Sequence, residues 1–148
     1  MKRINEYKKL FNVDQDLSLK TLKTSYRNLV KEWHPDKFQA GDEKAQEAEL
    51  MSRKVIDGYH FLVSISPETI EANKEEYAVT ITSPIMDWKH KGLLLEVTFL
   101  NGNTYEYFGV NKALYIKFSQ SDKQTRFAKR SIFNSFPYRK IKKSEVTA

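Results

Sequence analysis

The spacing of the apolar residues changes near residue 77, and this change constrains the fold more than any other feature of the sequence. Within residues 19–33, apolar side chains recur at intervals of three and four, as on one side of an α-helix. Within residues 92–100, they alternate with other residues, as on a β-strand. The sequence therefore predicts an α+β fold of two units: an all-helical hairpin within residues 1–76, and a small domain of antiparallel strands and two helices within residues 77–148.

Capping residues and prolines set the expected helix boundaries in the first half. Ser18 is a suitable N-cap for a helix that must end at His34, because Pro35 disfavours the helical conformation of the residue before it and has no amide hydrogen. Asp42 is the expected cap of a second long helix, which would pack antiparallel to the first. Ser66-Pro67-Glu68 predicts the start of a short further helix that ends near Glu76.

The second half reads as strands followed by helices. Asn101-Gly102 is a strong hairpin signal, since both residue types tolerate a positive φ. The predicted strands cover Tyr77–Ser83, Gly92–Leu100 and Asn103–Gly109, and the predicted helices cover residues 111–121 and 124–136. A basic tail, residues 138–143, would follow them.

Composition excludes several classes of protein. The chain has no cysteine, which excludes a disulfide scaffold, thiol catalysis and cysteine zinc sites, and its three histidines are widely separated. The N-terminus lacks an apolar signal region, and no stretch approaches the roughly 20 apolar residues of a membrane span. We therefore expect a soluble, cytoplasmic protein without metal or cofactor.

The net charge of +6 is divided unevenly between the two predicted units. Residues 1–76 contain 13 basic and 14 acidic residues, net −1, and residues 77–148 contain 12 and 5, net +7. This asymmetry favours different partners for the two units, and an anionic partner for the second.

A basic helical face precedes the tripeptide His34-Pro35-Asp36. Lys23, Arg27 and Lys31 recur every four residues and share one face of the first long helix. Because proline fixes the turn, His34 and Asp36 should project from the tip of a loop, where they can contact another molecule. Cations on one rigid face would speed and orient the approach of an acidic partner.

Four segments in this order resemble those of a J-domain, the module of DnaJ-type co-chaperones: Tyr7–Val13, Ser25–Trp33, the His-Pro-Asp loop and Asp57–Leu62. The resemblance covers residues 3–65. It implies a helical hairpin that docks on a DnaK-type chaperone and accelerates ATP hydrolysis there, so the chain itself would not be an enzyme. By matched position, His34, Pro35 and Asp36 would engage the chaperone, and Lys23, Arg27 and Lys31 would meet its acidic surface.

The sequence also departs from the J-domain pattern. Asn28 replaces a usual basic residue, and Gly58 replaces a usual alanine, at a cost of about 1 kcal/mol in helix propensity if nothing compensates. The basic fourth helix of the family is replaced by Pro67–Glu71. With five glycines in the whole chain, there is also no Gly/Phe-rich linker, so a general client-holding role is not expected.

Residues 83–141 resemble the KTSC domain, a short domain found at the C-terminus of some bacterial lysyl-tRNA synthetases and as a separate bacterial protein. The matched features are Leu95–Tyr107, with its Tyr-x-Tyr, and Phe136–Arg139. Tyr105 and Tyr107 lie on one face of a strand, where they would either stack unpaired RNA bases or pack as core; the small size of the domain favours core. The candidate nucleic-acid site comprises Tyr105, Tyr107, Arg126, Lys129, Arg130, Arg139 and Lys140.

We therefore expect a co-chaperone that recruits a DnaK-type ATPase to an RNA or a protein bound by the second unit, with no membrane partner. The alternative is an RNA-binding or translation-associated adaptor that only retains a J-like fold. The sequence leaves the client and the oligomeric state open.

Overall fold

The computed structural model describes residues 2–38 and 43–141. The chain divides into two compact units between Thr69 and Ile70. The described residues combine helices with a four-stranded antiparallel sheet, which confirms the predicted α+β class. No helix in this part of the chain is long and apolar enough to span a membrane.

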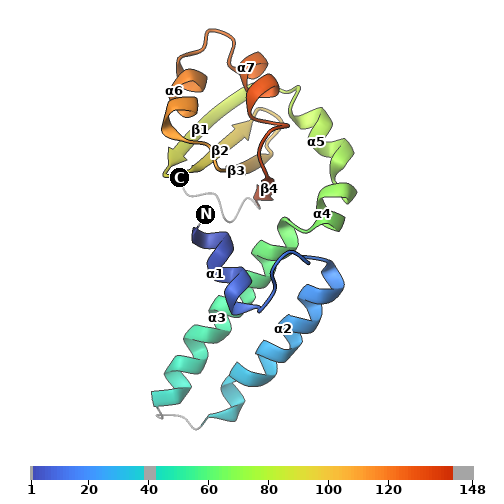
Figure 1. Ribbon diagram of the computed structural model, residues 1–148, viewed down its shortest axis with the longest axis vertical. Coiled ribbons are helices and arrows are strands. Elements are labelled where there is room, and N and C mark those ends of the chain that lie inside the picture. Colours follow the sequence, from blue (N-terminus) through green and yellow to red (C-terminus); the bar gives the residue numbers. More distant parts are fainter. Residues whose placement is uncertain (1, 39–42, 142–148) are drawn as a thin grey trace. The chain divides into compact units, whose positions relative to one another are not determined.

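The first unit is helical. Its elements are α1 (Lys2–Leu10), α2 (Leu19–Trp33), the single 3-10 turn η1 (Pro35–Lys37), α3 (Glu43–Ser64) and the first residues of α4 (Pro67–Ala72). α2 ends at Trp33 with His34 as its C-cap, one residue before the predicted end, and α2 and α3 run in opposite directions side by side, as predicted (Figure 1). The predicted cap Asp42 lies outside the described residues.

Two side chains cap the first turn of α2. Ser18 Oγ accepts a hydrogen bond from Thr21 N at 3.4 Å, which confirms the predicted N-cap. The Glu68 carboxylate, from α4, accepts from Leu19 N at 3.1 and 3.2 Å. Free amides at a helix start need such acceptors, and a carboxylate there is also favoured by the helix dipole.

A glycine allows α1 to approach α3 closely. Gly58 is buried, and a Cβ at this position would lie 2.8 Å from Cδ1 of Tyr7 and 3.1 Å from Cε1 of Phe11. The Tyr7 ring also packs on Phe61, with centroids 5.3 Å apart, and the Arg3 guanidinium lies 4.4 Å from the Phe61 centroid. The helix propensity lost at Gly58 is therefore offset by closer packing of Tyr7 and Phe11 on α3.

The second unit contains the sheet. It comprises the end of α4, α5 (Lys74–Thr80), β1 (Ile85–Lys91), β2 (Leu94–Phe99), β3 (Thr104–Phe108), α6 (Lys112–Gln120), α7 (Gln124–Ser131) and β4 (Tyr138–Ile141). The strands lie in the order β1-β2-β3-β4, all antiparallel, and the Asn101-Gly102 hairpin is confirmed between β2 and β3. Gly102 has the positive φ, 94°, that this turn requires.

The helices cover one face of the sheet. Leu95, Val97 and Phe99 of β2 point into a core that also contains Phe118 of α6 and Ala128 of α7. The other fully buried side chains of this core are Tyr105, Tyr107, Val110, Ile132 and Phe133. The predicted strands 92–100 and 103–109 and the predicted helix 111–121 are thus present with slightly narrower bounds, whereas the predicted helix 124–136 ends earlier, at Ser131.

The predicted strand Tyr77–Ser83 is wrong. This segment forms most of α5 and the turn after it. Tyr77 and Ile81 are buried, whereas Val79 between them is 67% exposed. A spacing of four fits both a strand and a helix, and Glu75 and Glu76 in the first turn favour the helix. The predicted domain boundary, after Glu76, falls inside α5.

Two strands have no counterpart in the sequence prediction. In β1, an irregularity between Ile85 and Asp87 breaks the alternation that would have revealed the strand. β4 lies within the segment predicted as a basic tail, and its pairing with β3 buries Arg139 and Ile141. Lys142 and Lys143 lie outside the described residues.

Replacing Gly58 by alanine should destabilise the helical unit by about 1 kcal/mol. Overpacking against Tyr7 costs about 1–3 kcal/mol, and improved helix propensity returns about 1 kcal/mol. The measurement is urea unfolding of a Trp88→Phe protein, in which Trp33 of the helical unit is the remaining tryptophan.

Two controls accompany this measurement. Lys54→Ala, at an exposed position of α3, should have little effect. In a Tyr7→Ala background, Gly58→Ala should be clearly less destabilising, because the nearer ring is gone and only Phe11 remains close, at 3.1 Å. A stabilising effect of Gly58→Ala with Tyr7 present would contradict the packing described here.

Candidate functional site

The tip of the helical hairpin presents His34 and Asp36 to solvent. His34 leaves the helix in an extended conformation, with φ −61° and ψ 129°, and the chain then makes one 3-10 turn in which Lys37 N donates to His34 O at 3.0 Å. The Asp36 side chain is 91% exposed and that of His34 is 50% exposed. The predicted projection of both side chains from this loop is therefore present.

The imidazole of His34 organises the turn from within. Its Nδ1 accepts a hydrogen bond from Asp36 N at 3.2 Å and lies 3.5 Å from Asp36 Oδ2. Because Nδ1 accepts, the neutral ring carries its proton on Nε2. The arrangement holds the Asp36 backbone while its carboxylate stays in water, free to accept a bond from an external cation.

The basic face of α2 leads to this tip. Lys23, Arg27 and Lys31 are all exposed. The opposite side of the helix is fixed to α3, since Leu22 is fully buried and the Tyr26 ring stacks on Tyr59 with centroids 4.3 Å apart. The structure therefore brings the three predicted cations together on one solvent-facing side of a well-packed helix.

The two tyrosines of β3 do not form an open stacking surface. Tyr105 is 1% exposed and Tyr107 0%. An unpaired base must reach the face of an aromatic ring to stack on it, and here the core occupies both rings. The prediction that they contact nucleic acid is contradicted by their burial, and the alternative, that they are core, is correct.

Tyr77 of α5 is the residue that closes this core. Its ring stacks on Tyr138 with centroids 3.9 Å apart and meets Tyr105 edge-on at 5.1 Å. Its hydroxyl donates to the carbonyl oxygen of Phe133 at 2.5 Å, so the Tyr107 hydroxyl, 3.1 Å away, donates to Tyr77. The sequence missed Tyr77 as part of this cluster because it placed the residue on a strand.

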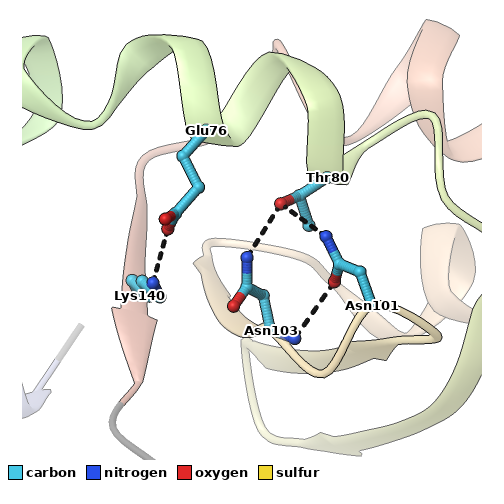
Figure 2. A network of polar contacts seen from close by, with 5 residues as sticks. All are labelled: Glu76, Thr80, Asn101, Asn103 and Lys140. Atoms are coloured by element: carbon cyan, nitrogen blue, oxygen red, sulfur yellow. Dashed lines mark hydrogen bonds and ion pairs between the residues drawn. The ribbon is translucent and has the colours of Figure 1, made fainter.

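Thr80, the last residue of α5, is hydrogen-bonded to the turn between β2 and β3. Figure 2 shows that Thr80 Oγ1 accepts hydrogen bonds from the side-chain amides of Asn101 and Asn103, both at 3.0 Å. The Asn101 side chain in turn accepts from Asn103 N at 3.1 Å. The Asn-Gly turn therefore both reverses the chain and holds the end of α5.

The predicted basic residues fall into two groups. Arg139 is buried and its Nε donates to Glu106 Oε1 at 2.6 Å, so the prediction that it binds phosphate is contradicted. If Arg139 moved to a phosphate, the Glu106 carboxylate would stay buried without its cation, which is energetically unfavourable. Lys140 is exposed at the surface but forms an ion pair with Glu76 (Figure 2).

Arg126, Lys129 and Arg130 remain as solvent-facing cations of α7. Lys129 and Arg130 follow Arg126 by three and four positions, so the three side chains share one side of the helix. The structure brings these three together and separates them from the buried tyrosines. In the described part of the chain, no cluster of three or more histidine and carboxylate side chains is placed to hold a metal ion.

Comparison with known families assigns part of the second unit. Residues 84–136 match the family model of the KTSC domain. This confirms the KTSC resemblance for the greater part of the predicted range, 83–141, while α5 and β4 lie outside the matched residues. No curated protein matches the chain. The resemblance seen in residues 3–65 stays a prediction.

Alkaline pH should unfold the second unit. Burial raises the pKa of Tyr77 and Tyr107, and raises the pKa of Tyr105 to about 12. An unfolded tyrosine has a pKa of about 10, so the unfolded chain releases these protons first. The stability that the cluster provides is full below about pH 10 and falls as pH rises above it.

The measurement is residue-resolved 13Cζ NMR of the tyrosines during a pH titration, together with Trp88 fluorescence in a Trp33→Phe protein. The signals of Tyr105 and Tyr107 should change only when the Trp88 signal reports unfolding. Titration of both near pH 10 in a folded unit would contradict their burial.

Proposed function

We propose that the chain is a J-domain co-chaperone, in which the helical unit docks on a DnaK-type chaperone and stimulates its ATP hydrolysis, and the second unit is the targeting module. The single observation that carries the proposal is the exposed His34–Asp36 tip at the end of the basic face of α2. It coincides with the four sequence segments that resemble a J-domain.

The electrostatic layout favours an acidic partner approached by α2 first. Lys23, Arg27 and Lys31 lie on a packed helix, so their charges keep a fixed orientation relative to Asp36. Such an array raises the association rate and selects the orientation of the complex. The Asp36 carboxylate would then accept a hydrogen bond from a cation of the chaperone, and this bond forms only in the docked complex. Truncation of one partner of such a desolvated pair costs about 2–5 kcal/mol.

Departures from the J-domain pattern are compatible with this proposal. Gly58 is matched by the close approach of Tyr7 and Phe11, so the unit gains packing where it loses helix propensity. Asn28 is exposed beside the cationic face. An asparagine in place of the usual basic residue lowers the charge of that face and leaves the core unchanged. We therefore expect a functional interaction that weakens with salt, but less steeply than it would with a cation at position 28.

Single-turnover ATP hydrolysis by a DnaK-type chaperone, with and without the full chain, tests the proposal. The chain should accelerate hydrolysis, and Asp36→Asn should lower the stimulation at least tenfold. The triple variant Lys23→Gln, Arg27→Gln, Lys31→Gln should raise the concentration needed for half-maximal stimulation and weaken its salt dependence.

Asp57→Asn is the matched control, because it removes an exposed carboxylate of α3 away from the tip. It should stimulate like the unmodified chain. Absence of stimulation by the unmodified chain, or equal stimulation by Asp36→Asn, would overturn the proposal.

A further inference from the structure

The charges of the second unit are sorted by location. Residues 111–131 contain six basic residues, all exposed, and a single acidic residue, Asp122. The six are Lys112 and Lys117 on α6, Lys123 just before α7, and Arg126, Lys129 and Arg130 on α7. The α6–α7 layer is therefore cationic as a whole, which the net charge of the chain does not reveal.

Apart from Asp122, the acidic residues that the structure describes in this unit lie on other elements, beginning with Glu71 at the end of α4. Glu75 and Glu76 belong to α5, and Glu76 pairs with Lys140. Asp87, Glu96 and Glu106 belong to strands; Glu96 and Glu106 are cross-strand partners, and they alternate with Val97 and Tyr105, which point into the core. The strand carboxylates therefore lie on the face of the sheet opposite α6 and α7, where they do not neutralise the helical layer.

The cations of the α6–α7 layer also have no ion-pair partner within the described chain. This differs from Arg139, which is buried against Glu106. On α7, burial of Ala128 and partial burial of Phe127 fix the helix, so Arg126, Lys129 and Arg130 point together into solvent. Their charges are available to an external anion.

The side chains on the exposed face of α7 favour one kind of partner over another. Protein interfaces depend on buried aromatic or aliphatic anchors. Among the described residues of the second unit, the exposed large apolar side chains are Val79, Met86, Leu93, Leu100 and Ile116. Ile116 lies on α6, and none of the five belongs to α7. A face of cations without apolar anchors fits a partner that is itself a regular array of negative charge, held through release of its counterions.

We propose that the exposed face of α7, formed by Arg126, Lys129 and Arg130, binds the phosphodiester backbone of nucleic acid. This deepens the proposed function by naming the partner class of the targeting module, and it does not require the chaperone. Since Tyr105 and Tyr107 are buried, the contact is made to phosphates and not to base faces. It should therefore depend strongly on salt and weakly on base sequence.

The test is titration of the full chain with labelled single-stranded RNA, duplex RNA and duplex DNA of equal length, at several salt concentrations from about 50 mM. If each of three cations replaces one counterion, their removal lowers the slope of log affinity against log salt by about 2–3. The variant Arg126→Gln, Lys129→Gln, Arg130→Gln should bind at least tenfold more weakly at low salt, and its folding is checked by Trp88 fluorescence in a Trp33→Phe background.

The matched control is Lys23→Gln, Arg27→Gln, Lys31→Gln, which removes the same number of charges from α2. It should bind nucleic acid nearly as well as the unmodified chain, while the α7 variant should keep its stimulation of a DnaK-type ATPase. Absence of binding to all three nucleic acids at low salt, or equal losses in the α2 and α7 variants, would overturn the proposal. Neither result depends on chaperone activity.

Discussion

The burial of Tyr77 against the sheet is the interaction on which the second unit depends. Its ring stacks on Tyr138 and meets Tyr105, and its hydroxyl joins Tyr107 to the Phe133 carbonyl. One side chain from α5 thus connects β3, β4 and the segment after α7. Both α5 and β4 lie outside residues 84–136, so the matched KTSC segment is completed by elements from either side of it.

This packing decides which side chains are left for binding. Burial of Tyr105 and Tyr107 removes aromatic rings from the surface, and the Glu106–Arg139 pair removes one cation. The charge that remains accessible is concentrated on α6 and α7. In the helical unit, the same principle applies with a different outcome: Leu22 and Tyr26 hold α2 on α3, which leaves the basic face and the His34–Asp36 tip in solvent.

The sequence was sufficient where a residue acts on its own neighbours. Ser18 caps α2 and Pro35 ends it, because both effects are local. It failed where the outcome depends on distant partners. The spacing of Tyr77 and Ile81 fits a strand or a helix; Glu75 and Glu76 favour the helix locally, and the contacts of Tyr77 with β3 and β4 stabilise it. Arg139 fits a nucleic-acid site by its charge alone, and the sequence gives no sign of its carboxylate partner, Glu106, which is 33 positions away in the chain. The role of Gly58 likewise depends on Tyr7, in another helix.

Residue-resolved NMR tests whether the tip of the helical unit binds a DnaK-type chaperone, as proposed above. The full chain, labelled with 15N, would be titrated with the ATPase domain of a DnaK-type chaperone. We expect shifts or line broadening at His34, Asp36, Lys37 and the exposed face of α2, with the amides of β2 and β3 unchanged. Unchanged signals from the tip at saturating ATPase domain, or changes confined to the second unit, would contradict the proposal.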